Sequence, residues 1–279
     1  MGNLSGTELS KKIKAEIAKE VEGLIALGKR APHLVTIIVG DNPASNVYVA
    51  NKKKACAEVG FKTTSIEYPE NISETRLIEA IEEYSADPLV DGVLVQLPLP
   101  KHINTDNVLK AIHSNKDVDG FHPSNVAKLW LGDKCIKPCT PQGIIDLIDY
   151  SGVDLDGKHV VVLGRSNIVG LPVAKMCLDR NATVTVCHSR TACLDEITRT
   201  ADVLIVAIGK PKFVTAEMIG EEAVVIDVGI NRDENGKLCG DVDYEYVSKY
   251  AKYITPVPGG VGPMTIACLL KNTLQCYKR

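Results

Sequence analysis

The feature that most constrains the fold of this chain is a short apolar run that enters a glycine turn. Residues 160–163 read Val-Val-Val-Leu, and the turn 164–166 that follows reads Gly-Arg-Ser. The segment Val169–Asp179 has helical character, and a second apolar run covers Ala182–Cys187. A strand, a tight turn, a helix and a second strand form a βαβ unit, whose strands pair in parallel. The pattern therefore predicts a parallel sheet with a glycine turn at its carboxyl edge.

The residues at this edge favour a dinucleotide site. A helix that begins after a glycine turn presents backbone N–H groups and a partial positive charge to a phosphate. A carboxylate roughly 20 residues after the first glycine would bind the ribose hydroxyls of NAD. This chain instead has Ser189 and Arg190 there, and Arg165 adds a second cation in the turn. A hydroxyl and guanidinium groups suit the 2′-phosphate of NADP, so we predict NADP rather than NAD.

The glycine spacing alone leaves a second interpretation open. Gly164 and Gly170 do not form the pattern G-x-G-x-x-G, which is itself a weak signal outside its structural context. An ordinary connection from strand to helix, in which glycines relieve crowding, would use the same two residues.

Length and composition set broad limits. The 279 residues, 45% of them apolar, are enough for two α/β lobes. The 32 basic and 35 acidic residues nearly balance, so charge gives no reason to expect nucleic acid or a membrane surface as a partner. No secretory signal and no run of ~18 apolar residues is present, so we expect a cytoplasmic protein. The nine cysteines form no C-x-x-C pair, which predicts reduced thiols and no metal site.

In the first half of the chain, apolar residues at helical spacing predict a helix over residues 7–27. Three pairs of strand and helix follow, with strands at 34–39, 63–68 and 92–96 and helices after Pro43, from Ser73 and near 105–113. This alternation predicts a parallel sheet. Residues 116–138 are rich in Asp, Pro and Gly and are expected to be irregular.

In the second half, a helix over 140–150 leads into strands at 159–163, 183–187, 203–207, 224–227 and 253–255. A final helix from Pro263 to about Tyr277 is expected to pack back on the first lobe. We therefore assign residues 1–139 and about 264–279 to one domain and residues 140–263 to the other. The sequence shows no internal repeat.

The helix after Pro43 carries a lysine on its apolar face. Tyr48 and Lys52 lie four residues apart, so they share a face, which continues through Ala55 and Val59. Burial disfavours the ammonium form, so such a lysine can act as a base or hydrogen-bond partner. The alternative is a lysine at the edge of the face whose amine reaches water.

Polar residues also follow two buried segments. Gln96 ends the strand 92–96, at the edge where α/β sheets bind ligands, and its amide could bond Lys52, bind a ligand or simply cap the strand. The sequence Asp117-Val118-Asp119-Gly120 is typical of an Asx turn, although one of its acids could anchor a nitrogen-rich ring.

The loop 255–265, Thr-Pro-Val-Pro-Gly-Gly-Val-Gly-Pro-Met-Thr, is richer in glycine and proline than a plain turn requires. We interpret it as a loop that a ligand approaches closely. A tight link from strand to helix is the alternative.

Five motifs together resemble the bifunctional methylenetetrahydrofolate dehydrogenase/cyclohydrolase family, over nearly the whole chain. They are Tyr48–Lys52, Asp91–Pro100, Asp117–Gly120, Gly164–Pro172 and Pro258–Thr265. The resemblance implies a two-lobed α/β fold, with an N-terminal catalytic domain, a C-terminal Rossmann domain and a cleft between them, usually in a homodimer.

The resemblance also implies two reactions in one-carbon metabolism, which supplies purine biosynthesis. NADP oxidises 5,10-methylene-tetrahydrofolate to the methenyl cation, and water then opens that cation to 10-formyl-tetrahydrofolate. By the same resemblance Lys52 handles protons, Tyr48 positions it, Gln96 holds it and Asp119 bonds the pterin. The implied folate contacts are Tyr48, Lys52, Val95, Gln96, Leu97, Asp119, Pro258, Gly259, Gly260, Val261, Gly262, Pro263, Met264 and Thr265, and the implied coenzyme contacts are Gly164, Arg165, Ser166, Ser189, Arg190 and Ile230.

Three other functions are compatible with parts of the sequence. A dehydrogenase that acts on folate without hydrolysis would share most motifs. A different two-lobed NADP oxidoreductase would act on a carbonyl and would need an acid to protonate the alkoxide. A nucleotide-sensing module would bind the dinucleotide while Lys52 served only the structure.

Overall fold

A computed structural model describes the chain from residue 2 to 279, without the side chains of Pro43 and Ala44. The chain forms two compact units. The three-stranded unit comprises residues 11–139 and 266–279, and the six-stranded unit comprises residues 2–10 and 140–265. Helices α1 (Gly6–Ala26) and α10 (Val261–Tyr277) each begin in the six-stranded unit and end in the other. The predicted α/β fold with parallel sheets is confirmed, and the predicted cleft stays a prediction.

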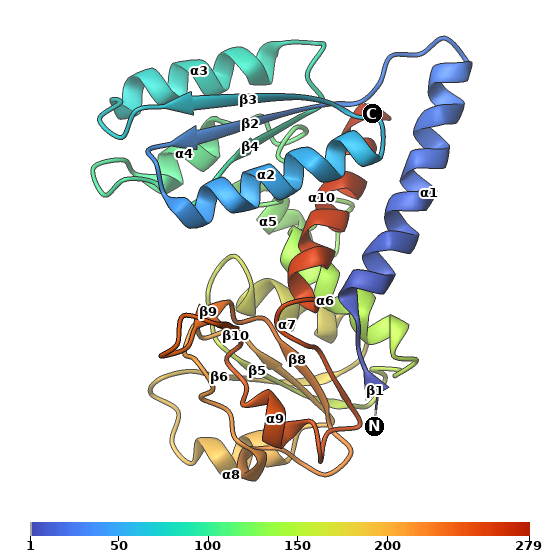
Figure 1. Ribbon diagram of the computed structural model, residues 1–279, viewed down its shortest axis with the longest axis vertical. Coiled ribbons are helices and arrows are strands. Elements are labelled where there is room, and N and C mark those ends of the chain that lie inside the picture. The colour runs from blue at the N-terminus through green and yellow to red at the C-terminus, as the bar shows by residue number, and fades with distance from the viewer. Residues whose placement is uncertain (1) are drawn as a thin grey trace. The chain divides into compact units, whose positions relative to one another are not determined.

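The three-stranded unit is built on a parallel sheet in the order β3-β2-β4. Its strands are β2 (His33–Val39), β3 (Lys62–Tyr68) and β4 (Gly92–Val95). All residues of β2 and β4 are buried, and apart from His33 and Thr36 in β2 they form nearly continuous apolar runs rather than an alternating pattern. Helices α2 (Pro43–Glu58) and α3 (Glu74–Ala86) cover opposite faces of the sheet (Figure 1).

Two further helices complete this unit. Helix α4 spans Thr105–Ala111 and shares the core of α3, through residues such as Val108 and Leu77. Helix α5 spans Pro123–Leu131, inside the segment that the sequence predicts to be irregular, so that prediction is wrong there. Pro123 begins the helix and Gly132 ends it in the left-handed conformation, two signals that fit a helix. Near the end of α10, the Asn272 amide donates to the carbonyls of Val118 and Lys137.

The six-stranded unit holds an all-parallel sheet in the order β1-β11-β8-β7-β5-β6 among the described residues. Its elements are β1 (Gly2–Asn3), α6 (Cys139–Tyr150), β5 (His159–Leu163), α7 (Gly170–Leu178), β6 (Thr183–Cys187), α8 (Leu194–Arg199), β7 (Val203–Val206), a 3₁₀ turn (Ala216–Met218), β8 (Val224–Asp227), α9 (Tyr244–Val247) and β11 (Tyr253–Ile254). A hairpin of β9 (Asn231–Arg232) and β10 (Leu238–Cys239) stands apart from this sheet.

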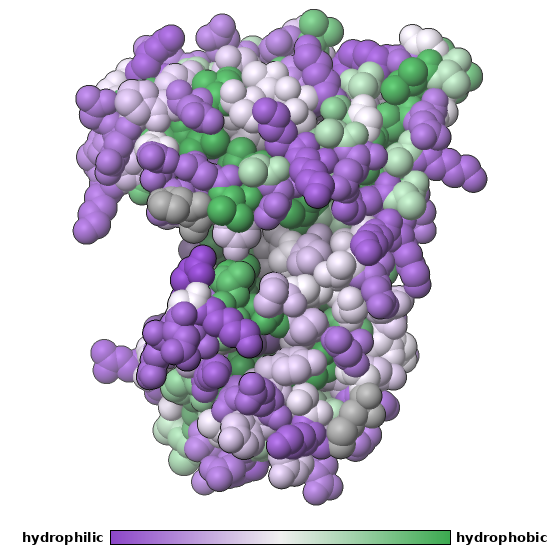
Figure 2. Space-filling model, in the orientation of Figure 1, coloured by the Kyte–Doolittle hydropathy of each residue, from purple (hydrophilic) through white to green (hydrophobic). Residues whose placement is uncertain are grey.

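Polar and charged side chains cover most of the visible surface of both units, and apolar residues show there in small patches (Figure 2). No helix among residues 2–279 is long and apolar enough to cross a membrane. Among the described residues, one cluster of buried apolar side chains packs against the three-stranded sheet and another against the six-stranded sheet.

Candidate active site and nucleotide edge

Lys52 lies on the inward face of α2 and is only 8% exposed. Its Nζ donates a hydrogen bond of 3.0 Å to Oε1 of Gln96. The predicted inward orientation is therefore present, and the alternative in which the amine reaches water is not. Gln96 follows the last residue of β4, so the end of a buried strand positions the acceptor of the lysine.

Gln96 is itself held in one orientation. Its side-chain Nε2 donates to the carbonyl of Leu97 at 2.7 Å, and its backbone N–H donates to the carbonyl of Ile37 in β2 at 2.9 Å. Because the NH₂ group is engaged, the amide oxygen is the part that faces Lys52. The glutamine thus fixes the position of the amine from the sheet side.

The two acids of the sequence Asp117–Gly120 have separate roles. Asp117 is buried and forms the turn, because its carboxylate accepts from the backbone N–H groups of Gly120, Phe121 and His122. Asp119 is left out of that turn. Burial raises the pKa of Asp119, and the nearby charge of Lys52 opposes this rise. Lys52, Gln96 and Asp119 therefore gather an amine, an amide and a carboxyl group.

Tyr48 lies one helical turn before Lys52 on α2 and is half-buried. Burial raises the pKa of its phenol, so the hydroxyl keeps its proton and can donate a hydrogen bond at neutral pH. A phenol, an amine, an amide and a carboxyl group on neighbouring elements can orient a polar ring and move protons beside it.

The glycine turn lies where the six-stranded sheet changes direction. Strand β5 has β6 on one side and β7 on the other, which makes its carboxyl end a topological switch point, the place where such sheets bind nucleotides. Gly164 has a φ of +127°, and a Cβ there would lie 2.3 Å from the carbonyl oxygen of Ala207. A Cβ on Gly170 would lie 2.2 Å from the carbonyl oxygen of Gly164. Close backbone packing thus requires both glycines.

The start of α7 is capped from within the turn. The Ser166 Oγ accepts from the N–H groups of Val169 at 3.2 Å and Gly170 at 3.4 Å. The hydroxyl hydrogen of Ser166 remains able to donate to a ligand. Arg165 in the same turn is exposed, so its guanidinium can reach an anion.

A second exposed turn follows β6. The His188 N–H donates to Thr191 Oγ1, the Thr191 N–H donates to the His188 carbonyl, and the Arg190 N–H donates to His188 Nδ1. These bonds leave Ser189 and Arg190 exposed at the tip. Ile230, after β8, is also exposed. A hydroxyl and two guanidinium groups fit a phosphorylated ribose better than a free one.

The loop 255–265 belongs to the six-stranded unit, whereas Lys52 belongs to the other, so its part in folate binding stays a prediction. A Cβ on Gly6 would lie 1.9 Å from the carbonyl oxygen of Gly260, and the Thr7 N–H donates to the carbonyl of Gly259. Packing against the start of α1 therefore accounts for part of the glycine content. Helix α10 begins at Val261, two residues before the predicted start.

The remaining residues predicted to contact folate differ in exposure, and their contacts with folate stay a prediction. Val95 and Met264 are buried. Leu97, Gly262, Pro263 and Thr265 are partly exposed, and Pro258 is exposed. Thr265 Oγ1 is within hydrogen-bond distance of Thr140 Oγ1, which ties the first turn of α10 to α6.

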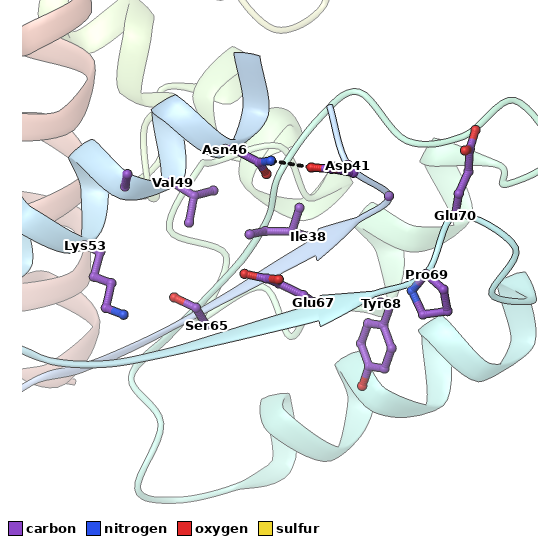
Figure 3. A pocket seen from close by; sticks show the side chains of 12 residues that line it. Ile38, Asp41, Asn46, Val49, Lys53, Ser65, Glu67, Tyr68, Pro69 and Glu70 are labelled. Atoms are coloured by element: carbon purple, nitrogen blue, oxygen red, sulfur yellow. Dashed lines mark hydrogen bonds between the residues drawn. The ribbon is translucent and has the colours of Figure 1, made fainter. Parts of the chain in front are cut away.

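A cavity of about 580 Å³ lies beside α2 and β3, away from the lysine cluster. Lys53 from α2 and Ser65 and Glu67 from β3 point into it, and the Asn46 amide donates to Asp41 at its rim (Figure 3). Lys52, Gln96 and Asp119 are not among its lining residues. Successive lysines of one helix thus face different surroundings.

The parallel sheet with a glycine turn at its switch point defines a nucleotide-binding α/β protein with a second unit that carries a polar cluster. Models of the tetrahydrofolate dehydrogenase/cyclohydrolase family match residues 4–119, as the catalytic domain, and residues 138–279, as the NAD(P)-binding domain. The chain belongs to this family.

Relatives match over the full length. The bifunctional protein FolD of Streptococcus mutans is 54% identical over 276 residues, which are 99% of this chain and 97% of that protein. The crystal structure of FolD from Campylobacter jejuni has a TM-score of 0.97 at 50% identity, covering 100% of this chain and 99% of that one. The FolD structure from Trypanosoma brucei, complexed with NADP and an inhibitor, has a TM-score of 0.95 at 40% identity and covers 100% and 97%.

Proposed function

We propose that this protein oxidises 5,10-methylene-tetrahydrofolate to the 5,10-methenyl cation with NADP and then hydrolyses the cation to 10-formyl-tetrahydrofolate. The observation that carries the proposal is the partly buried hydrogen bond between Lys52 and Gln96, next to Asp119, in the domain that the family model describes as catalytic. Full-length similarity to bifunctional relatives supports both activities.

In the first step, the methylene carbon of the folate loses a hydride and its two nitrogens share the resulting positive charge. NADP, when bound, accepts the hydride. No proton moves in this step, so the protein has to align the reacting carbons and little more. Asp119 anchors the pterin by hydrogen bonds, and Tyr48 covers and orients the folate beside Lys52.

In the second step, a water oxygen bonds to the cationic carbon and loses one proton, which leaves a hydroxyl group on that carbon. The bond from the carbon to one of its two nitrogens then breaks, that nitrogen takes up a proton, and the hydroxyl loses its proton to leave the formyl group on the other nitrogen. Proton transfer is the work of this step, and Lys52 is the group placed to do it. The Gln96 oxygen holds the amine in position. This lysine also favours the bifunctional enzyme over a relative that only oxidises, because hydride transfer has no need of it.

The coenzyme site is formed by Gly164, Arg165, Ser166, Ser189, Arg190 and Ile230. NADP is the coenzyme named for the Trypanosoma brucei relative, and the exposed cations of this chain suit the same choice. The 2′-phosphate binds to Arg190 and Ser189, where an NAD enzyme would place a carboxylate. The loop 258–265 contributes to the folate side.

Three finer features belong to the same proposal. The enzyme works in the cytoplasm and its product serves purine biosynthesis. It also forms a homodimer, which fits the described part of β3: this strand pairs with β2 alone, and an open edge invites another strand. Light scattering that gives the mass of a single chain would contradict the dimer.

The experiment is to mix the purified protein with methylene-tetrahydrofolate and either NADP or NAD. We expect reduced coenzyme to form about tenfold or more faster with NADP. The reason is that only NADP carries the 2′-phosphate, a charged group to which Arg190 and Ser189 can hydrogen-bond. Arg190→Ala should remove most of that preference without lowering the rate with NAD. No reduced coenzyme in either mixture would end the proposal.

A further inference from the structure

One buried carboxylate of the six-stranded unit binds two separate loops. Asp241 is 0% exposed and accepts hydrogen bonds from the backbone N–H groups of Ile208 at 2.7 Å, Gly209 at 2.9 Å and Lys210 at 2.8 Å. It also accepts from the side-chain amide of Asn231 at 2.8 Å. Four donors on one carboxylate make a rigid junction, since each would be costly to leave unpaired in the core.

Both loops leave the sheet at the nucleotide edge. The segment 208–210 follows β7 directly after Ala207, whose carbonyl oxygen lies against the Gly164 turn. Asn231 begins β9, at the end of the loop that follows β8. The residue before it, Ile230, is one that the family resemblance places at the coenzyme. Asp241 therefore links the two loops that border the glycine turn on the side of β7 and β8.

The backbone around Asp241 is held in place by a second buried carboxylate, that of Asp227. Asp227, at the end of β8, accepts from the N–H groups of Gly229, Asp241 and Val242. A Cβ on Gly229 would lie 2.4 Å from Asp241 Oδ1, so the backbone closes around the carboxylate. The side chain of Asp241 has neither room to move nor access to a ligand.

We infer that Asp241 is a positioning residue for NADP: it fixes the loops after β7 and β8 in the arrangement that the coenzyme binds. The inference rests on the proposed function and deepens it. It assigns to Asp241 no contact with folate and no part in hydrolysis, because all four of its bonds go to the coenzyme loops.

The three-stranded unit holds a matched case. Asp117 accepts from three successive N–H groups, of Gly120, Phe121 and His122, and from the amide of Asn125 at 2.9 Å. Asp117 and Asp241 thus bind backbone N–H groups and one asparagine amide in the same way. The loop that Asp117 holds, however, carries Asp119, which we place on the folate side. Comparing the two carboxylates separates an effect on one ligand from a general loss of structure.

The test compares Asp241→Asn with Asp117→Asn in the two half-reactions. Hydrolysis of methenyl-tetrahydrofolate needs no coenzyme, so it reports the folate side alone. For Asp241→Asn we expect the KM for NADP to rise about tenfold or more, with kcat of hydrolysis within about twofold of wild type. For Asp117→Asn we expect kcat of hydrolysis to fall about tenfold or more, with the KM for NADP within about twofold of wild type. An unchanged KM for NADP, or an equal loss of both reactions in Asp241→Asn, would overturn the inference.

Two further variants guard against a failure to fold. Asn231→Ala removes one of the four bonds from a partly exposed residue, and we expect a rise of about threefold in the KM for NADP. Asp233→Asn is the control, because its carboxylate accepts from the N–H groups of Asn235 and Lys237, in the turn between β9 and β10. It should leave the KM unchanged. If Asn231→Ala behaves like Asp233→Asn, the positioning role is wrong.

Calorimetric titration with NADP distinguishes failure of the positioning role from failure of the proposed function. A wild-type protein that binds NADP but does not oxidise the folate contradicts the proposed function, and weaker binding by Asp241→Asn would still support the positioning role. A wild-type enzyme that turns over while both Asp241→Asn and Asn231→Ala bind NADP normally contradicts only the positioning role. Absence of NADP binding by wild type overturns both.

Discussion

Strand β2 of the three-stranded unit and strand β5 of the six-stranded unit each begin with a histidine that makes a corresponding set of contacts. His33 Nδ1 lies 3.0 Å from the carbonyl of Leu89, and its Nε2 lies 2.9 Å from Thr64 Oγ1. His159 makes the corresponding contacts at the same distances, with the carbonyl of Thr200 and with Thr185 Oγ1, and its Nδ1 also lies 3.1 Å from Thr200 Oγ1.

The strands around these histidines also pair alike. The backbone N–H of each histidine donates to an aspartate that comes just before a neighbouring parallel strand. The acceptor is Asp91 before β4 for His33 and Asp202 before β7 for His159, at 2.8 Å in both cases. The register agrees, since Leu34 pairs with Gly92 and Val160 with Val203. The two units thus share one framework at the amino edge.

The carboxyl edges differ. In the three-stranded unit β4 leads to Gln96, which accepts a hydrogen bond from the buried Lys52 of α2. In the six-stranded unit β5 leads to Gly164 and a capped helix. Similar frames thus lie in a domain that the family models describe as catalytic and in one that they describe as NAD(P)-binding. In our proposal, contacts at the amino edge secure each sheet, and residues after the carboxyl ends of the strands decide the function.

The strongest test of this division replaces the buried lysine. In Lys52→Met we expect hydrolysis to fall at least about a hundredfold, because the proton-transfer group is gone, while hydride transfer to NADP continues and the methenyl form accumulates. Both rates are followed in one absorbance assay. Lys53→Met, in which the exposed neighbouring lysine is changed, serves as the control. Equal rates of hydrolysis in the two variants would break the assignment.

The reciprocal test changes the glycine turn. Gly164→Ala places a Cβ against the carbonyl of Ala207 and strains a φ of +127°, so we expect the KM for NADP to rise about tenfold while hydrolysis stays near wild type. Gly157→Ala shares a positive φ but meets open space, and it should leave the KM unchanged. Loss of hydrolysis in Gly164→Ala would show that the units do not divide the work.

A smaller effect is expected when the shared framework is cut. His33→Ala removes the ring contacts to Leu89 and Thr64, and His159→Ala removes those to Thr200 and Thr185. We expect the free energy of unfolding in urea to fall by about 2 kcal/mol for buried His33 and about 1 kcal/mol for the more exposed His159. Neither variant should change the ratio of the two activities. If replacing one of the histidines leaves the free energy of unfolding unchanged, the two frameworks are alike in geometry but not in their contribution to stability.

The smallest expected effect is a dependence of stability on pH. Burial lowers the pKa of His33 below its usual value of about 6.5. Its stabilising contribution is therefore complete above the unfolded pKa and is lost as pH falls through the folded pKa. The difference in unfolding free energy between wild type and His33→Ala should shrink, by under ~1 kcal/mol, between about pH 8 and pH 5. A difference that grows on acidification would contradict this.

Much of the fold is predictable from local patterns. The buried strands are continuous apolar runs between turn residues, so the expected β5 and β6 match the observed bounds, and β2 differs by one residue. Lys52 is also predictable, because helical periodicity alone puts it on the apolar face. Long-range pairing is not. Strand β1 has two residues and exists only because β11 lies beside it.

The shared framework escapes sequence comparison for a related reason. Each histidine contacts residues from neighbouring strands, so the repeat lies in the contacts and the register while the sequences around them differ. Asp241 is hidden in the same way, since nothing near it in sequence reveals that its partners follow β7. Helix α5 is different: its proline and glycine are visible signals, and the acidic, proline-rich surroundings obscure them.

The most direct measurement is a crystal structure of the protein with a stable folate analogue bound. We expect Lys52 Nζ, still bonded to Gln96, to lie within hydrogen-bond distance of the one-carbon position or of a water molecule on it, with Asp119 on the pterin. An analogue bound elsewhere, with the amine of Lys52 facing only protein atoms or bulk water, would contradict the account.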